Sequence, residues 1–217
     1  SRVSPSRAGS NGGIGTVTNT SDARPGYSGF HTKDTSTIAR ILRGSGYSTA
    51  AFGKWHQTPD WEASPAGPFD RWPTGEGFER FYGFMGGETD QYDPTLYDGV
   101  TPIVRPAGNA YHLTEDLAAK AIEWLHTQKA VTPDKPVLLY FAPGATHAPF
   151  QAPKAWIERY RGRFDGGWDA LRQEIFARQK KLGVIPADTV LTPRDPQLPA
   201  WSSLAPDQKR IAARLME

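Results

Sequence analysis

Two stretches of this chain pass from a helical pattern through a turn into a short apolar run, and this order strongly restricts the fold. In the first stretch, residues 34–46 carry apolar side chains at helical spacing after N-cap candidates at Asp34, Thr35 and Ser36. The small-residue run that follows, residues 47–53 (YSTAAFG), is typical of a strand packed on both faces. We therefore expect a short helix followed by a buried strand.

The same order recurs further along the chain. Residues 113–128 predict an amphipathic helix that starts at Thr114, with acidic side chains at its positive end. Residues 136–143 (PVLLYFAP) are a continuous apolar run between prolines, as in a buried strand of a parallel sheet. Two helix–strand pairs, separated by long loops such as 59–73 and 92–106, predict an α/β sheet with helices on its faces.

Beyond residue 153 the pattern becomes helical. Helices are predicted at 156–160 and 168–181, and a last one after a cap at Ser203 and Pro206. This final pattern is still helical at Glu217, and no natural boundary is visible at either end. We therefore expect an internal portion of a longer protein.

Composition excludes several classes of function. The 25 basic and 23 acidic residues are interspersed, so no basic stripe predicts a nucleic-acid partner. The longest apolar run, 136–143, is far too short to span a membrane, and the first fifteen residues lack the apolar core of a targeting signal. Without cysteine, disulfides and thiolate metal sites are excluded. The compartment and the oligomeric state stay open.

The residues that directly follow the predicted strands are the first candidates for a site. In open α/β sheets, ligands bind beyond the carboxyl ends of the strands, where Lys54, His56 and His147 would lie. A lysine offers a compact fixed charge, and imidazoles can donate to an oxyanion or exchange a proton near neutral pH. Together they suit an ester of a tetrahedral oxyanion. The other histidines are expected to be surface or packing residues: His31, His112 and His126.

Residues 37–56 (TIARILRGSGYSTAAFGKWH) resemble the sulfatase family, in which a helix, a Gly-Tyr-x-Thr strand and a Gly-Lys-Trp-His turn follow in that order. Residues 67–99 and 146–186 resemble the arylsulfatase segments that come next, so the resemblance covers the chain from about Pro25 to its end. It implies an alkaline-phosphatase-like α/β sheet with flanking helices, incomplete at both ends. The implied partial catalytic domain divides into an altered nucleophile-motif segment at 1–24, an α/β core with long loops at 25–153 and a helical segment at 154–217.

The resemblance also implies a role for each site residue. Lys54 matches the lysine that binds a sulfate oxygen, and His56 the histidine that contacts the hydrated formylglycine nucleophile. His147 matches the histidine that assists departure of the alcohol, and Arg7 belongs to the nucleophile motif. These roles agree with a reaction in which charge builds on the leaving oxygen. The implied partner is a small-molecule sulfate ester.

The N-terminal motif departs from the family pattern. The family carries a cysteine or serine that is oxidised to formylglycine, whereas here Val3 stands at that position and cannot react in this way. Calcium is the expected cofactor, yet neither of the family's acidic ligand pairs can be assigned. Glu88 and Asp90 fit a turn network or a substrate rim better than a metal cluster. We therefore expect this chain to be an incomplete and inactive portion of an arylsulfatase.

Several aromatic side chains are expected to pack rather than react. Trp55 lies between two site candidates, and its ring should point away from them toward a helix. Packing is also expected for the aromatic residues of the glycine-rich loops, although any of them could border an aryl pocket: Trp61, Trp72, Phe81, Tyr82 and Phe84.

Two other functions stay open. A phosphodiester or phosphonate ester hydrolase would share the same superfamily sheet, although the Gly-Lys-Trp-His context favours sulfate. A non-catalytic protein that binds anions is supported by Val3, while Lys54, His56 and His147 argue against it.

Overall fold

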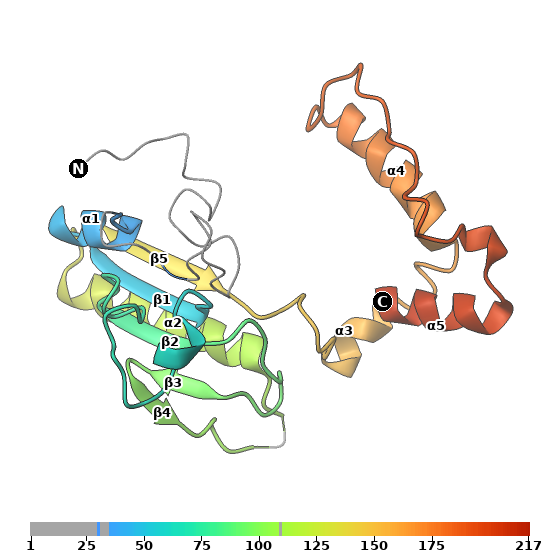
Figure 1. The fold of residues 1–217 in the computed structure, drawn as a ribbon. Coiled ribbons are helices and arrows are strands. Elements are labelled where there is room, and N and C mark those ends of the chain that lie inside the picture. Colours follow the sequence, from blue (N-terminus) through green and yellow to red (C-terminus); the bar gives the residue numbers. More distant parts are fainter. Residues whose placement is uncertain (1–29, 31–34, 109) are drawn as a thin grey trace. The chain divides into compact units, whose positions relative to one another are not determined.

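A five-stranded sheet forms the centre of the chain up to Gln151 in the computed structural model, which describes residues 30, 35–108 and 110–217 (Figure 1). The strand order is β4-β3-β2-β1-β5. β1 runs parallel to both β2 and β5, while β3 and β4 join antiparallel. The strands are β1 (Ser48–Lys54), β2 (Arg80–Phe84), β3 (Leu96–Asp98), β4 (Thr101–Ile103) and β5 (Val137–Ala142).

The first predicted helix–strand pair is confirmed, with a different cap. Helix α1 (Ile38–Gly44) leads into β1, which is buried along nearly its whole length. The N-cap is Thr37, whose backbone is extended and whose Oγ1 accepts a hydrogen bond from Arg40 N at 3.2 Å. Thr35 and Ser36 therefore lie outside the helix, and Asp34 lies outside the described residues. Thr37 caps the helix because, among the polar residues of this segment, it lies nearest to the exposed N–H groups of the first turn.

The second helix–strand pair is also present, but its strand is less buried than expected. Helix α2 (Leu113–Val131) begins one residue before the predicted Thr114, and His112 caps it by accepting from Thr114 N. Strand β5 is parallel to β1, as predicted. It nevertheless lies at one end of the described sheet, where Tyr140 and Phe141 are 45% and 40% exposed. The expectation of a buried strand was wrong because burial depends on strand order as well as on apolar sequence.

Three further strands lie in segments that the sequence did not identify. β3 and β4 occupy part of the predicted loop 92–106, and β2 precedes them. The two loop strands are short, which leaves little periodic signal. Tyr82 of β2 pairs with Asp98 of β3, and Arg80, two residues before Tyr82, donates to both carboxylate oxygens of Asp98.

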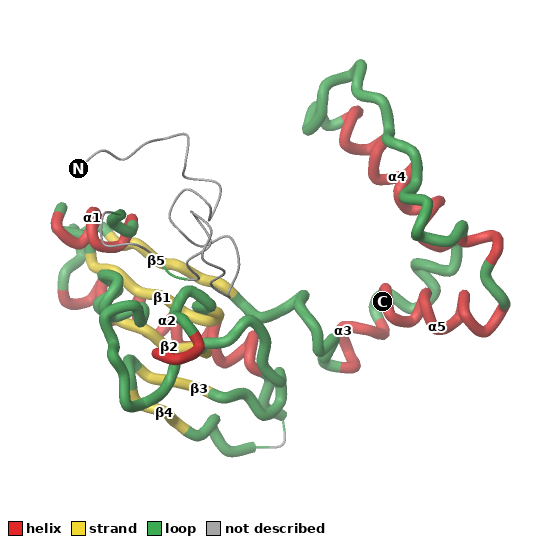
Figure 2. Tube along the Cα trace, viewed as in Figure 1, coloured by secondary structure: helices red, strands yellow, loops and turns green. Residues whose placement is uncertain are grey.

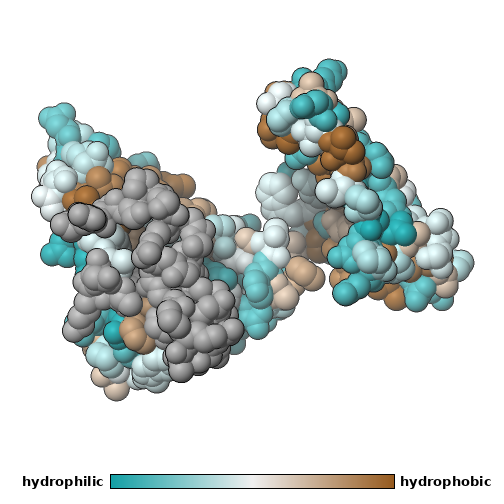
Figure 3. All heavy atoms as spheres, turned by 45° about the horizontal axis from the view of Figure 1, so that its top comes forward, coloured by the Kyte–Doolittle hydropathy of each residue, from teal (hydrophilic) through white to brown (hydrophobic). Residues whose placement is uncertain are grey.

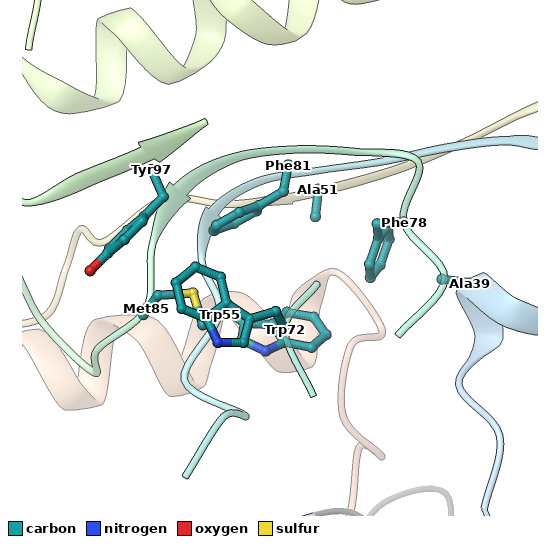
Figure 4. Close-up of a cluster of buried hydrophobic side chains, with 8 residues drawn as sticks. All are labelled: Ala39, Ala51, Trp55, Trp72, Phe78, Phe81, Met85 and Tyr97. Atoms are coloured by element: carbon teal, nitrogen blue, oxygen red, sulfur yellow. The ribbon is translucent and has the colours of Figure 1, made fainter. Parts of the chain in front are cut away.

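Side chains alternate between the two faces of the sheet and build one apolar cluster on each. Helix α2 covers one face, where the buried cluster is Ala50, Phe52, Tyr82, Phe84, Leu96, Leu113, Leu117 and Ala121. The opposite face carries Ala39, Ala51, Trp55, Trp72, Phe78, Phe81, Met85 and Tyr97 (Figure 4). Mostly loop residues, rather than a helix, cover this second face. Burial of a large apolar side chain contributes about 1.5–3 kcal/mol, so these loops are held firmly.

The predicted packing of aromatic residues is confirmed except at one position. Trp55 is buried against Phe78 at 5.8 Å between ring centroids, and its Nε1 donates to Arg71 O at 3.1 Å. Its partners are thus mainly loop residues, and α1 contributes Ala39 rather than a full helix face. Trp61, by contrast, is 60% exposed. The other residues confirmed as buried are Trp72, Phe81, Tyr82 and Phe84.

The chain from Ala152 to Glu217 forms a separate unit of helices and loops (Figure 2). The three predicted helices are present as α3 (Lys154–Glu158), α4 (Gly167–Lys181) and α5 (Pro206–Met216), with a short 3-10 helix η4 (Trp201–Ser203). Ala205, not Ser203, precedes α5, because the Ser203 hydroxyl donates back to Ala200 O.

Apolar side chains remain at the surface of this second unit (Figure 3). The most exposed are Leu182, Val184 and Val190. None of the helices in the described ranges is long and apolar enough to cross a membrane.

Candidate active site

The carboxyl ends of β1, β2 and β5 meet at one edge of the sheet, because the three strands are parallel (Figure 1). Gly53 of β1 pairs with Gly83 on one side and with Ala142 on the other. Lys54 is the last residue of β1 and is partly buried. The structure therefore places Lys54 where ligands of open α/β sheets bind.

Two glycines allow the strands to approach closely just before this edge. A Cβ on Gly53 would lie 2.0 Å from the carbonyl oxygen of Ala142, and Gly53 has a φ of +109°. A Cβ on Gly83 would lie 2.0 Å from the carbonyl oxygen of Gly53. Only glycine fits either position without displacing backbone. These contacts fix the strand ends from which the candidate residues extend.

His56 lies just beyond Lys54 and keeps close contact with the chain after β2. Trp55 N donates to Phe84 O and His56 N to Met85 O, both at 3.0 Å. His56 has a φ of +52°, which is uncommon for a residue with a side chain and often marks a functional position. Its ring lies against Gly87, where a Cβ would be 2.6 Å from His56 Cε1.

The surroundings of His56 lower the pKa of its imidazole below the ordinary value. Burial is the largest cause, followed by the positive charge of Lys54, and His147 acts in the same direction. Asp60 opposes this shift. His56 is therefore mainly neutral at pH 7, able to accept a proton, and it lies within electrostatic reach of both other candidates.

His147 lies in the turn after β5, where its backbone N–H donates to Gly144 O at 3.0 Å. Its Nδ1 lies 3.2 Å from Glu88 Oε2 and 2.8 Å from Ala148 O. Glu88 directly follows Gly87, which contacts the His56 ring. The Gly87–Glu88 pair thus brings the loops of His56 and His147 to the same place.

The sequence did not identify this role of Gly87 and Glu88. The available signal was a glycine pair followed by an acid shortly after an aromatic run, in residues 80–88. Val3 and Arg7, the remaining predicted site positions, lie outside the described residues.

Asp90 belongs to a turn network, as expected. Its Oδ1 accepts from Tyr92 N at 2.7 Å and from Asp93 N at 2.8 Å, and its Oδ2 accepts from Gln151 Nε2 at 2.7 Å. The Gln151 hydrogen bond is the largest cause of a lowered pKa of Asp90. Gln151 also accepts from Gln91 N at 2.7 Å, so it joins this turn to the segment that follows His147.

The described residues do not fit a calcium site. Within these ranges, no group of three or more His, Cys, Asp or Glu side chains could hold a metal ion. Asp90 uses Oδ1 within the turn and Oδ2 with the Gln151 side chain, and Glu88 is paired with His147. Because Ca²⁺ prefers six to eight oxygen ligands, neither acid supplies the beginning of such a site.

The chain is similar to known proteins over most of its length. The family model described as Sulfatase matches residues 6–204. An uncharacterized sulfatase of Schizosaccharomyces pombe is 31% identical over 212 residues, covering 89% of this chain and 36% of the relative. An arylsulfatase of Klebsiella aerogenes is 30% identical over 204 residues, covering 89% of this chain and 41% of the relative. The chain thus spans well under half the length of these two relatives.

Solved structures also resemble part of the chain. The crystal structure of Ps i-CgsB in complex with k-i-k-neocarrahexaose is 24% identical and has a TM-score of 0.49, covering 60% of this chain and 31% of that one. The predicted α/β class is confirmed by the sheet itself, and the predicted family by the match over most of the sequence. With that match and relatives at 30–31% identity, this chain belongs to the sulfatase family.

Proposed function

We propose that this chain supplies the sulfate-binding part of the active site of a sulfate ester hydrolase of the arylsulfatase type. The observation that carries the proposal is the meeting of three loops at one sheet edge. His56 rests on Gly87, Glu88 pairs with His147, and the Lys54 charge acts on His56. A fixed cation beside two imidazoles suits an ester of a tetrahedral oxyanion.

Each side chain then has a distinct task. Lys54 binds a sulfate oxygen as a fixed positive charge. His147, with Nδ1 occupied by acceptors, has Nε2 left to donate a proton to the ester oxygen when the ring is charged. His56, whose lowered pKa keeps it neutral, can accept a hydrogen bond from the attacking group. Arg7 is assigned to the same site through its place in the nucleophile motif.

We also propose that the chain as given does not turn over sulfate esters. Val3 stands where the family has its formylglycine precursor, and a hydrocarbon side chain offers no nucleophile. The described residues hold no cluster of metal ligands. Bound sulfate would then be positioned but not attacked. Val3 is also the observation that favours the alternative of a non-catalytic, anion-binding protein.

Sulfate binding tests the proposed site directly. At constant ionic strength, sulfate should raise the melting temperature of the chain more than chloride does, and Lys54→Ala should abolish the difference. Lys120→Ala is the matched control, because it removes a lysine that pairs with Glu123 on α2. Equal sulfate effects in the original chain and in Lys54→Ala would instead mean general exclusion of sulfate from the surface and would refute the site. Stronger stabilisation by inorganic phosphate at matched charge would favour a phosphate ester hydrolase.

Hydrolysis of 4-nitrophenyl sulfate tests the proposed inactivity. Neither the original chain nor Val3→Cys treated with a formylglycine-generating enzyme and calcium should release nitrophenol. Calcium-dependent turnover by either chain, lost in His147→Ala, would show that metal ligands exist and that the chain is not inactive.

A further inference from the structure

The segment that carries His147 is held on both sides of the histidine by one residue of the loop after β2. His147 N donates to Gly144 O, and a Cβ on Gly144 would lie 3.0 Å from Gln91 Nε2. The buried Gln91 side chain therefore rests on the start of this turn. At the end of the segment, Gln151 Oε1 accepts a hydrogen bond from Gln91 N at 2.7 Å. Gln91 thus contacts residues before and after the histidine.

Gln151 joins this segment to two other parts of the same unit. Its Nε2 donates to Asp90 Oδ2 at 2.7 Å, in the loop after β2. Its carbonyl oxygen lies 3.0 Å from His112 Nε2. Because Nδ1 of that ring already accepts from Thr114 N, Nε2 carries the proton and donates it to Gln151 O. The end of the segment is therefore bonded both to the loop and to the N-terminus of α2.

The contact between Asp90 and Gln151 is stronger than the neighbouring pair of Glu88 and His147. The Gln151 hydrogen bond is the largest cause of the lowered pKa of Asp90, so the acceptor is a charged carboxylate. Charge-assisted hydrogen bonds are roughly twice as strong as neutral ones. The Glu88 and His147 side chains are 62% and 52% exposed, and an ion pair in such contact with water contributes little.

Both contacts join the same two segments of the chain. Asp90 follows Glu88 by two residues, and Gln151 follows His147 by four. The exposed pair cannot hold the two segments together by itself. The hydrogen bonds of Gln151 can, and they fix the distance at which Glu88 meets the imidazole.

We propose that Gln151 is a positioning residue, which holds the His147 ring against Glu88 and so directs Nε2 toward the ester oxygen. The inference rests on the proposed function, because it assumes that His147 protonates the leaving group. Gln151 acts through the histidine and does not contact the ester itself.

The tautomer of His147 reports this positioning without any ligand. In long-range ¹H–¹⁵N spectra of the full chain, the neutral ring should carry its proton on Nδ1. In Gln151→Ala the ring is less restrained, so both tautomers should be populated and the two ¹⁵N shifts should move toward each other. Tyr82→Phe is the matched control, because it removes a hydrogen bond to Asp116 from the same unit. It should leave the ¹⁵N shifts of His147 unchanged.

An exchange of donor and acceptor tests the Asp90 contact directly. Gln151→Glu sets a second carboxylate opposite Asp90 and should release His147 as Gln151→Ala does. Asp90→Asn, added to Gln151→Glu, supplies an amide that can donate back across the contact. The remaining oxygen at position 90 can still accept from Tyr92 N and Asp93 N. This double variant should therefore restore the Nδ1 tautomer.

The affinity for methyl sulfate, measured by NMR titration, shows whether Gln151 acts through His147. Gln151→Ala should weaken binding by about two- to tenfold, which is the equivalent of one hydrogen bond. In a His147→Ala chain the same substitution should have no further effect, because residues that act as a unit are not additive.

The outcomes separate this inference from the proposed function. A Gln151→Ala chain that keeps the Nδ1 tautomer would refute the positioning role. Equal losses of affinity with and without His147 would also refute it, since Gln151 would then support the fold only. If the double variant does not restore the tautomer, the Asp90 contact is not the one that matters. If Lys54→Ala and His147→Ala both leave the methyl sulfate affinity unchanged, the proposed function itself fails, whatever the tautomer shows.

Discussion

Glu88 Oε2 lies 3.2 Å from His147 Nδ1, and Ala148 O lies 2.8 Å from the same nitrogen. A carboxylate and a carbonyl oxygen can only accept hydrogen bonds, so Nδ1 has to carry the proton. Both side chains are more than half exposed, so the ion pair itself contributes only about 0–1 kcal/mol to stability. Its effect is to orient the ring and to leave Nε2 for a ligand.

The first prediction concerns the tautomer of His147. In its neutral form, the ring should carry its proton on Nδ1. Long-range ¹H–¹⁵N correlation spectra distinguish the two nitrogens, with the exposed His126 ring of α2 as the reference. A neutral His147 ring protonated on Nε2 would contradict the role given to Glu88 and Ala148.

The second prediction concerns the titration of His56. Burial and the Lys54 charge lower its pKa, so NMR titration should place it below that of an unperturbed histidine. Lys54→Met removes one of these causes and should raise the pKa of His56, whereas Asp60→Asn should lower it further. Shifts of the same sign in both variants would show that charge is not responsible.

The same pKa shift makes stability depend on pH. Because the pKa of His56 is lower in the folded chain, the unfolded chain takes up this proton first as the pH falls. The contribution of His56 to the free energy of unfolding is therefore undiminished above about pH 6.5 and declines below it. The free energy of unfolding of His56→Gln, measured with urea, should lack this part of the pH dependence.

Local sequence patterns were sufficient to predict β1, α2 and the strand β5 parallel to β1, because helical spacing and apolar runs reflect short-range structure. They also predicted a strand that ends next to Lys54 and His56, although Lys54 is itself the last residue of β1. The outer position of β5 could not be predicted, since it depends on the order of strands that are far apart in sequence.

Long-range contacts of single side chains could likewise not be predicted from the sequence. Glu88 and His147 meet across a long stretch of sequence, and no periodic pattern marks either of them. Trp61 was expected to pack because tryptophan is apolar, but Glu62 and Trp72 fill the inner side of its turn. Such competition between neighbours for one interior position is decided by three-dimensional packing.

The third prediction concerns a shared carboxylate at the start of α2. The hydroxyl groups of Tyr82 and Tyr111 donate to the same Asp116 Oδ2, at 2.6 and 3.0 Å. Asp116→Ala leaves both phenols without this acceptor and should cost about 2 kcal/mol in the free energy of unfolding. Glu115→Ala, an exposed acid in the same turn, should cost less than about 1 kcal/mol. Equal losses would mean that only the helix dipole matters.

These phenols also predict a loss of stability at alkaline pH. Burial is the first cause of the raised pKa of Tyr82 and of Tyr111, and Asp116 adds to both shifts. Because each pKa is higher in the folded chain, the stabilisation is complete below about pH 10 and is lost above it. Tyr82→Phe should weaken this dependence in urea unfolding measured across that range.

The last prediction concerns the glycine contact behind the site. Gly53→Ala would place a methyl group 2.0 Å from Ala142 O, on backbone that cannot move without separating β1 from β5, and would also force a side chain onto a φ of +109°. It should cost about 3 kcal/mol in the free energy of unfolding. Gly44→Ala is the matched control, because nothing lies within 4 Å of its Cβ position at the end of α1, and it should change stability by less than about 1 kcal/mol. Urea unfolding measures both. Since Gly53 directly precedes Lys54, Gly53→Ala should also weaken sulfate binding in the part of the population that remains folded, whereas Gly44→Ala should leave it unchanged. A destabilised Gly53→Ala chain with unaltered sulfate affinity would show that the strand contact supports the fold but does not position Lys54.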